Sequence, residues 1–259
     1  CMCAEKTCLL KEGVKVRELL LVTAHLLGDF YFQSESMSRS KRDNPGKLIL
    51  HSFIYVIPFA AVLLLYGSWV LIAVGLPVLF AMHFIIDSIK VKFMKIFDSG
   101  KADLIFFVAD QLIHAAVIIE LCIVMDVFPE LVQADRDITN ELAGISDILF
   151  FMMSALICIK PASIFIKHAL NAMNGASTVS EDKGVTGGGS IIGVLERLIS
   201  LALGYMGLYS LIGLVLTAKS IARFEQLKEK EFAEKYLVGT LASLAVVTAL
   251  LLIRYFSAS

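Results

Sequence analysis

The sequence predicts an all-α fold, a polytopic transmembrane helical bundle of about six to eight membrane helices. Of its 259 residues, 58% are hydrophobic and only 18% are charged, and the mean hydropathy is +0.79. These values do not fit a soluble globular domain. Several apolar runs reach the roughly 20 residues that a helix needs to cross a bilayer. Runs such as 60–65 lack the alternation of a transmembrane barrel strand, so the spans should be helical.

The apolar runs define the expected spans in chain order. They cover 17–33, 48–66, 68–89, 104–127, 147–169, 191–217 and 236–256. Lysine and arginine are concentrated in two connections, residues 34–47 and the segment after Asp87, which places both connections on the cytoplasmic side of a bacterial membrane. A single crossing at 191–217 would put later basic residues outside, whereas a hairpin turning near Gly204–Gly207 would return them. The sequence leaves both arrangements open.

The expected spans divide the chain into three regions. Residues 1–16 form a polar tail with three cysteines, Cys1, Cys3 and Cys8, to which the sequence assigns no role. A start at Cys rather than Met is what a trimmed sequence would show. Residues 17–127 form a four-helix membrane domain. Residues 128–259 hold the remaining membrane helices, with a Gly-rich loop at 171–190 and a charged surface helix at 218–235.

The charge balance bears on the partners of the protein. The net charge of −1 gives no reason to expect a nucleic acid. Membrane lipids are the expected surroundings, and the oligomeric state is left open.

Histidines and aspartates form a repeated pattern in the first four spans. The chain has five histidines, and three of them lie four residues from an aspartate. The pairs are His25 with Asp29, His83 with Asp87, and Asp110 with His114. Residues four apart share a helix face, and carboxylates are costly in hydrocarbon. Three such pairs in apolar spans therefore exceed what chance would place there.

The depth of these residues indicates that they converge. His51 opens the second span, and Gln33 lies two turns from His25 on the same face of the first. At 1.5 Å per residue, the aspartates, His51 and Gln33 lie within about 5–16 Å of the span ends that adjoin the basic connections. The predicted cluster thus occupies one leaflet, on the cytoplasmic side.

A divalent metal ion would explain such a cluster. A lone charge in hydrocarbon costs at least about 2.5–3.5 kcal/mol, and a bound cation offsets that cost. Imidazole and carboxylate donors favour zinc, with manganese or iron as alternatives, and the donors suffice for one or two ions. The predicted metal ligands are His25, Asp29, His51, His83, Asp87, Asp110 and His114.

Other polar residues are candidates for contacts to a substrate or to the metal ligands. They are Gln33, Gln111, Glu196 and Arg197. Arg197 would bind an anionic headgroup, and Glu196 would accept a proton. The plainer interpretation of these two charges is an ion pair between helices. For the whole cluster, the corresponding alternative is a structural network in which buried histidines and aspartates only hydrogen-bond across helices.

The motifs also resemble a known family. They are the runs from His25 to Gln33 (HLLGDFYFQ), from His83 to Lys90 (HFIIDSIK) and from Asp110 to His114 (DQLIH), with Lys41, His51 and Tyr55. Over about the first half of the chain they resemble a bacterial membrane family described only as domain of unknown function 3307. Segments 193–197, 218–224 and 239–241 are similar to its longer members. The resemblance implies a membrane fold in which these residues form one site, and it implies no activity.

Three functions are compatible with the pattern. The first is a metal-dependent hydrolase, to which helices with HxxxD pairs are loosely similar. Asp29, Asp87 or Asp110 would act as general base on a water activated by the ion, and the substrate would be lipid-linked or amphiphilic. The second is a divalent-metal transporter, which needs its ion near the midplane with access from both sides. The third is a non-catalytic membrane protein with a structural His/Asp network.

Overall fold

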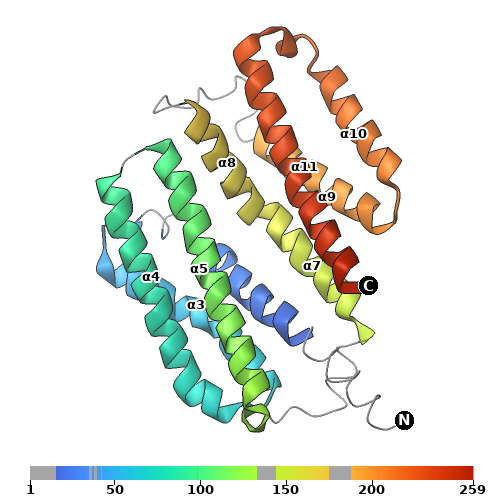
Figure 1. Ribbon diagram of the computed structural model, residues 1–259. Helices are drawn as coiled ribbons and strands as arrows, with labels where there is room; N and C mark the ends of the chain where they lie inside the picture. The colour runs from blue at the N-terminus through green and yellow to red at the C-terminus, as the bar shows by residue number, and fades with distance from the viewer. Residues whose placement is uncertain are drawn as a thin grey trace. The chain divides into compact units, whose positions relative to one another are not determined.

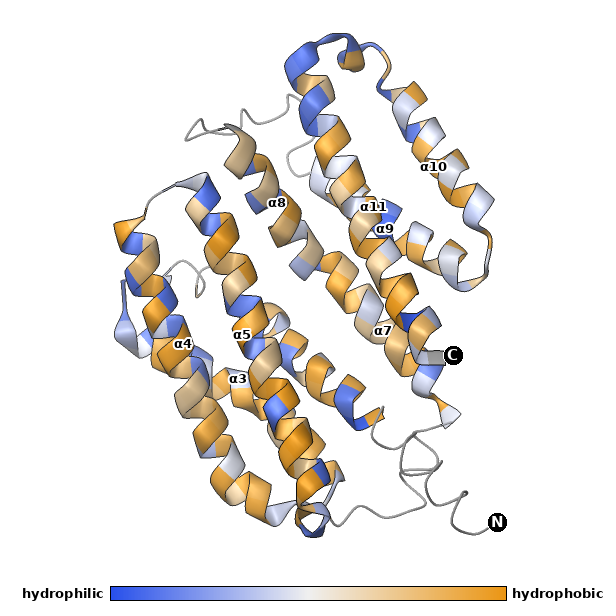
Figure 2. Ribbon diagram, viewed as in Figure 1, coloured by the Kyte–Doolittle hydropathy of each residue, from blue (hydrophilic) through white to orange (hydrophobic). Residues whose placement is uncertain are grey.

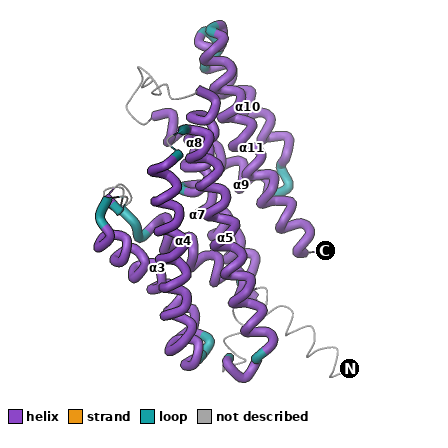
Figure 3. Tube along the Cα trace, turned by 60° about the vertical axis from the view of Figure 1, so that its left-hand side comes forward, coloured by secondary structure: helices purple, strands orange, loops and turns teal. Residues whose placement is uncertain are grey.

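The computed structural model describes residues 16–34, 37, 40–41, 43–97, 99–132, 144–174 and 188–258. Within these ranges the chain forms helices joined by turns and contains no strand, as Figures 1 and 3 show. The predicted all-α fold is confirmed. The polar tail up to residue 15, with its cysteines, and the centre of the Gly-rich loop at 175–187 lie outside the described residues.

Five helices are long and apolar enough to cross a membrane. They are Pro45–Leu65, Leu71–Ile96, Gly100–Val127, Ser146–Met173 and Lys230–Ser257. Figure 2 shows hydrophobic colours along most of their length. Large apolar side chains are exposed on them, such as Ile57 at 57% and Leu112 at 66%, and a surface of this kind is stable in lipid rather than in water. The protein is an integral membrane protein.

The chain forms two compact units, Cys1–Phe97 with Phe106–Met153, and Asp98–Ile105 with Ser154–Ser259. In the first unit an α-helix at 16–26 continues into a π-helical turn, η1 (Leu27–Tyr31). It is followed by α3 (Pro45–Leu65), η2 (Leu71–Gly75), α4 (Leu76–Ile96) and α5 (Gly100–Val127), whose first residues belong to the second unit. Helix α3 packs against both η1 and α4.

Residues at its two ends specify where helix α3 begins and ends. The Asn44 side chain accepts hydrogen bonds from the backbone N–H groups of Gly46 (2.9 Å) and Lys47 (3.3 Å). Pro45 occupies the first turn, where no backbone donor is needed. After the helix, Gly67 has a φ of 61°, a left-handed conformation that favours glycine. The start and the length of α3 are therefore specified locally.

Two contacts set the position of the first helix against its neighbours. Gly28 lets it cross α3 closely, because a Cβ at this position would lie 2.7 Å from the carbonyl oxygen of Tyr55. Arg17, at the start of the helix, forms an ion pair with Asp126 near the end of α5. Together they fix the register of the helix, and with it the position of Asp29.

The second unit is built around a helical hairpin. It contains the end of α7 (Ser146–Ile159), α8 (Pro161–Asn174), α9 (Gly188–Tyr205), α10 (Tyr209–Ala222) and α11 (Lys230–Ala258). Helix α9 packs against α10 and α11, and α11 packs against α8. The predicted span 191–217 is thus a hairpin rather than one long helix. The chain turns at 206–208, where Gly207 has a φ of 72°, which is within the region that the glycines indicated.

The predicted surface helix at 218–235 is not a single helix. Helix α10 ends at Ala222, a 3₁₀ turn, η4 (Gln226–Lys228), follows, and α11 begins at Lys230. Charged residues keep helical spacing after the turn, as in the Lys235–Glu231 pair (2.6 Å), so periodicity alone could not reveal the break. Figure 2 shows this connection as hydrophilic. The Gly-rich loop is also shorter than the predicted range 171–190, because residues 171–174 and 188–190 are helical.

Candidate metal centre

Three side chains from three helical segments converge in the first unit. One ligand-type atom of each of Asp29, His51 and His83 lies within 4.8 Å of the others, and both histidines are buried. The two Nε2 atoms are 3.1 Å apart, and the His51 Nε2 is 3.4 Å from Asp29 Oδ1. Zinc bonds of about 2.0–2.1 Å place neighbouring ligands of a tetrahedral ion roughly 3.3–3.4 Å apart. Both separations are close to that spacing. We call these residues the ligand group.

A further carboxylate lies beside the ligand group. Asp87 Oδ2 is 3.5 Å from the Nε2 of His51 and 3.8 Å from the Nε2 of His83. The same oxygen accepts a hydrogen bond from Lys41 Nζ at 2.7 Å. Catalytic zinc centres typically have three protein ligands and keep a fourth position for water. The ligand group offers three such side chains that could hold an ion, and the Asp87 carboxylate lies next to them.

A chain of hydrogen bonds orients His83. The Nδ1 of His114 lies 2.8 Å from the backbone carbonyl oxygen of Asp110, and a carbonyl only accepts, so this nitrogen carries the proton. In the neutral ring the other nitrogen of His114 is an acceptor, and it lies 2.7 Å from His83 Nδ1. His83 Nδ1 therefore donates, and the lone pair of its Nε2 faces His51. Metal-binding histidines are commonly held through their second nitrogen in this way.

His25 supports the cluster through Gln111. The Gln111 amide nitrogen donates to Asp29 Oδ2 (3.2 Å) and to Asp110 Oδ2 (3.1 Å). Its oxygen lies 3.2 Å from the Nε2 of His25, whose Nδ1 is 3.1 Å from the Tyr55 hydroxyl. Both nitrogens of His25 are thus used in hydrogen bonds. His25 positions Asp29 indirectly, through Gln111, and is not a member of the ligand group.

Aromatic packing holds the imidazole rings in place. The Tyr55 ring is stacked on His83, with centroids 3.7 Å apart and planes inclined by 6°. The rings of His25 and His114 are also stacked, with centroids 5.2 Å apart. The imidazoles therefore have little freedom to rotate, which preorganises their nitrogens for a ligand.

Two lysines of the family-like motifs, which were not among the predicted metal ligands or substrate contacts, reach the cluster. Lys41 donates to Asp87, and Lys90 donates to Asp110 Oδ2 at 2.7 Å. Their side chains are only 11% and 23% exposed. The basic connections predict membrane topology, and nothing in that pattern indicates that two of their lysines turn inward. Two signals were available: the family resemblance includes both lysines, and Lys90 follows Asp87 by three residues and so shares its helix face.

Asp29 lies in the π-helical turn η1. The N–H of Phe32 donates to the carbonyl of Leu27, five residues earlier, at 2.8 Å. A π turn takes up one extra residue and is frequent at functional sites. The helix ends in this turn, so Gln33, which was predicted to share a helix face with His25, lies beyond the helix. Gln33 lies in a bend, and its buried Oε1 has no hydrogen-bond partner within the described residues.

A comparison with protein families covers the part of the chain that holds this cluster. Residues 18–139 match the family model "Protein of unknown function (DUF3307)". This region is a domain of unknown function 3307. The resemblance to this family over about the first half of the chain is thereby confirmed. No curated protein and no solved structure matches the chain.

The DUF3307 domain contains all seven predicted metal ligands, and hydrogen bonds and His–Asp contacts join them in one network. They are His25, Asp29, His51, His83, Asp87, Asp110 and His114. The ligand group holds three of them, Asp87 lies beside it, and the other three support it. Of the two glutamines, Gln111 is part of the network.

Glu196 and Arg197 lie outside the DUF3307 match, in the second unit. Glu196 Oε2 accepts a hydrogen bond from Lys219 Nζ at 2.6 Å, an ion pair between α9 and α10. The Arg197 guanidinium donates to three groups, the carbonyl of Cys158 (2.7 Å) and the hydroxyls of Ser163 (2.5 Å) and Ser243 (3.3 Å). Both charged groups are satisfied within their own unit. Glu196 thus forms the predicted ion pair between helices, whereas the acceptors of Arg197 named here are uncharged.

Replacing Arg197 by Lys should therefore destabilise the second unit and leave the metal site unchanged. Lysine keeps the charge but lacks the planar fork of donors, and each lost hydrogen bond to a charged group costs about 1.5–3 kcal/mol. We expect a clearly lower thermal unfolding midpoint in detergent with the same metal content. Arg223→Lys, where the arginine bonds Gln226 at the surface, is the control. Loss of metal from Arg197→Lys would contradict this assignment.

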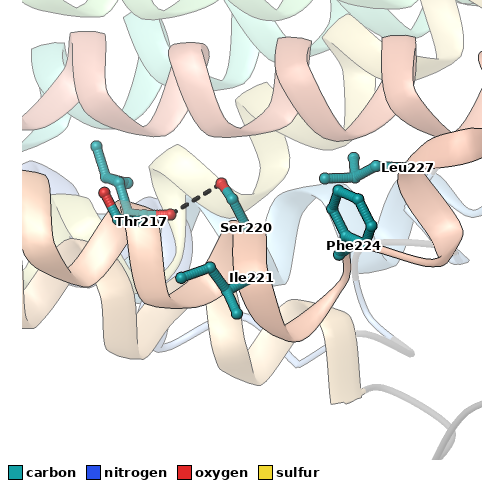
Figure 4. A pocket seen from close by; sticks show the side chains of 6 residues that line it. Thr217, Ser220, Ile221, Phe224 and Leu227 are labelled. Carbon is teal, nitrogen blue, oxygen red and sulfur yellow. Dashed lines mark hydrogen bonds between the residues drawn. The ribbon is translucent and has the colours of Figure 1, made fainter.

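A pocket of about 330 Å³ on the second unit contains none of the predicted site residues. Figure 4 shows its lining, which consists of Leu216, Thr217, Ser220, Ile221, Phe224 and Leu227. The Ser220 hydroxyl donates to the Leu216 carbonyl at 2.9 Å, and the Thr217 hydroxyl donates to the Gly213 carbonyl at 2.8 Å. With both hydroxyls donating to the helix backbone, the lining offers mainly apolar surface.

Proposed function

We propose that the protein is a metal-dependent hydrolase that binds one divalent ion, zinc by preference, at the ligand group. The observation that carries the proposal is the convergence of Asp29 Oδ1 and the Nε2 atoms of His51 and His83 at ligand-like spacings. Two nitrogens and one oxygen suit zinc, and manganese or iron are the alternatives. His114 orients one of the nitrogens before any ion arrives.

The charge of the cluster also supports a bound cation. The carboxylates of Asp29, Asp87 and Asp110 carry three negative charges, and Lys41 and Lys90 supply two positive ones. Charge left unmatched at membrane depth costs at least about 2.5–3.5 kcal/mol. The described side chains thus have one negative charge in excess, which attracts a cation, and a divalent ion would turn this excess into one positive charge.

The residues suggest a division of roles. A divalent ion in such a site supplies an activated water at neutral pH. Asp87 is the carboxylate beside the ligand group, so it would take the proton of that water as general base. Asp29 would be a ligand. Asp110, which is bonded to Lys90 and Gln111, would hold the supporting network.

The depth of the cluster indicates the kind of substrate. His51 follows the start of α3 by six residues, Asp87 precedes the end of α4 by nine, and Asp110 follows the start of α5 by ten, or roughly 9–15 Å at 1.5 Å per residue. We assign these helix ends, with their basic connections, to the cytoplasmic side of a bacterial membrane. A lipid-linked or amphiphilic substrate would bring its scissile bond to this depth.

Metal content tests the proposal directly. Wild-type protein purified in detergent after growth with zinc should hold about one equivalent, and His51→Ala and His83→Ala should each hold less than about a tenth of that, since each removes a ligand. His168→Ala, which removes a histidine of α8 in the second unit, is the matched control and should keep its metal. The measurement is elemental mass spectrometry on protein of verified monodispersity.

Two results would overturn the proposal. Wild-type protein that stays metal-free would leave only the hydrogen-bonded network. Metal-loaded protein that moves zinc into proteoliposomes and hydrolyses no ester or phosphoester probe would instead identify a transporter.

A further inference from the structure

Tyr55 contacts two sides of the cluster at once. It belongs to α3, one helical turn after His51, and is only 2% exposed. Its ring is stacked on His83, with centroids 3.7 Å apart. Its hydroxyl group is hydrogen-bonded to the Nδ1 of His25, at 3.1 Å. One buried side chain of α3 thus joins the first helix to α4.

The hydroxyl group of Tyr55 begins a chain of contacts that ends at Asp29. The Nε2 of His25 lies 3.2 Å from the side-chain oxygen of Gln111, and the Gln111 amide nitrogen donates to Asp29 Oδ2 at 3.2 Å. The first contact forms whichever partner is the donor, because a hydroxyl group both donates and accepts. The His25 ring is therefore held at both nitrogens, and the chain reaches a member of the ligand group.

The ring of Tyr55 acts on a different member of the ligand group. Its plane is inclined by only 6° to that of His83. The ring itself is held by Phe59, with centroids 5.1 Å apart, and by the close crossing at Gly28, where an added Cβ would lie 3.1 Å from its Cδ2. The His83 imidazole can rotate only by leaving this stack, so its Nε2 keeps its direction toward His51.

We infer that Tyr55 is a positioning residue of the proposed ion site, which holds His83 through its ring and Asp29 through its hydroxyl group. The inference rests on the proposed function, because these two side chains are ligands of the ion in that function. Groups that orient metal ligands without touching the ion typically contribute about 10- to 100-fold to metal affinity or activity. Because the ring and the hydroxyl group act on different ligands, substitutions can separate their contributions.

The zinc affinity of the full-length protein in detergent tests the role of the hydroxyl group. Tyr55→Phe keeps the stacked ring, and we expect it to raise the dissociation constant for zinc about 10- to 100-fold, measured by competition with a chromogenic chelator. Tyr66→Phe is the matched control. Tyr66 is also buried in the first unit, and its hydroxyl group has no hydrogen-bond partner among the described residues. Its variant should bind zinc as tightly as the wild type does.

A double-mutant cycle tests the path from the hydroxyl group to Asp29. If this path runs through His25 and Gln111, Tyr55→Phe should weaken zinc binding by less than about twofold in a protein that already carries Gln111→Ala. Independent roles would make the two fold-changes multiply. That result would refute the path.

Cobalt-loaded protein tests the role of the ring. Sites of imidazole and carboxylate ligands accept cobalt in place of zinc, and the visible absorption of cobalt(II) reports the geometry of its ligands. Tyr55→Leu removes the stack on His83, so its absorption bands should shift further than those of Tyr55→Phe, which keeps the stack. Identical spectra of the two loaded variants would refute the role of the ring.

The outcomes separate this inference from the proposed function. Wild-type protein that binds no zinc would refute the proposed hydrolase. Wild-type protein that binds zinc no more tightly than Tyr55→Phe does would refute the positioning role and leave the ion site intact. A purely structural hydroxyl group would lower the unfolding midpoint of metal-free Tyr55→Phe and leave its dissociation constant for zinc unchanged, which would also overturn the inference.

Discussion

Protein carrying Asp87→Asn should keep its bound metal and lose turnover by about 100- to 10,000-fold, the usual contribution of a general base. An amide cannot accept a proton at neutral pH, but its size and its place beside His51 and His83 are unchanged. The measurement is the rate constant kcat for a chromogenic ester or phosphoester in mixed micelles, with metal content determined in parallel.

Asp103→Asn, in the first turn of α5, is the matched control for this substitution. It should leave both turnover and metal content at the wild-type level. Full turnover by metal-loaded Asp87→Asn would rule out Asp87 as the base. Loss of metal together with turnover would show that the Asp87 carboxylate, 3.5 Å from His51 Nε2, is itself a ligand.

Gly28→Val should remove the metal and lower stability by about 1–3 kcal/mol or more. A Cβ at this position would lie 2.7 Å from the carbonyl oxygen and 3.0 Å from the Cα of Tyr55. These are backbone atoms of α3 and cannot swing aside, so the first helix must move away. Asp29, one residue further, would then lose its approach to His51. Thermal unfolding and metal content measure the two effects.

The control for the glycine substitution is Gly213→Val in α10, where an added Cβ has nothing within 4 Å. It should change neither property beyond the small gain in helix propensity of Val over Gly. A Gly28→Val protein with an unchanged midpoint and a full equivalent of metal would show that the crossing of the first helix and α3 does not control the site.

The convergence of histidines and aspartates could be predicted because it depends on regular geometry. An apolar run of sufficient length in a bilayer has to be helical. Spacing of four residues then puts His83 and Asp87 on one face, and counting from the span ends gives their depth. The glycines offered a hairpin turn as one of two arrangements, and the structure has this turn, with Gly207 in a left-handed conformation.

Features that depend on irregular backbone could not be predicted. The first helix ends in a π turn before Gln33, and no periodicity in the sequence indicates where this turn lies. Lys41 approaches Asp87 because of the path of a connection, so its charge by itself indicated only topology, and only the family resemblance linked it to the site. The break at η4 lies in a stretch whose charges keep helical spacing on both sides. Arg197 and Glu196 were candidates for substrate contacts because of their charge. Their hydrogen-bond partners follow only from the packing of the second unit.

The position of the cluster along the chain has a consequence for the assembly of the protein. All residues of the cluster and both lysines lie between 25 and 114, and chains are synthesised and begin to fold from the N-terminus. At the ribosome, the whole set of donors is available while α8 to α11 are still to be made. Loading of the proposed ion can thus precede insertion of the hairpin, and a shortage of metal would affect the first unit while the second is still being translated.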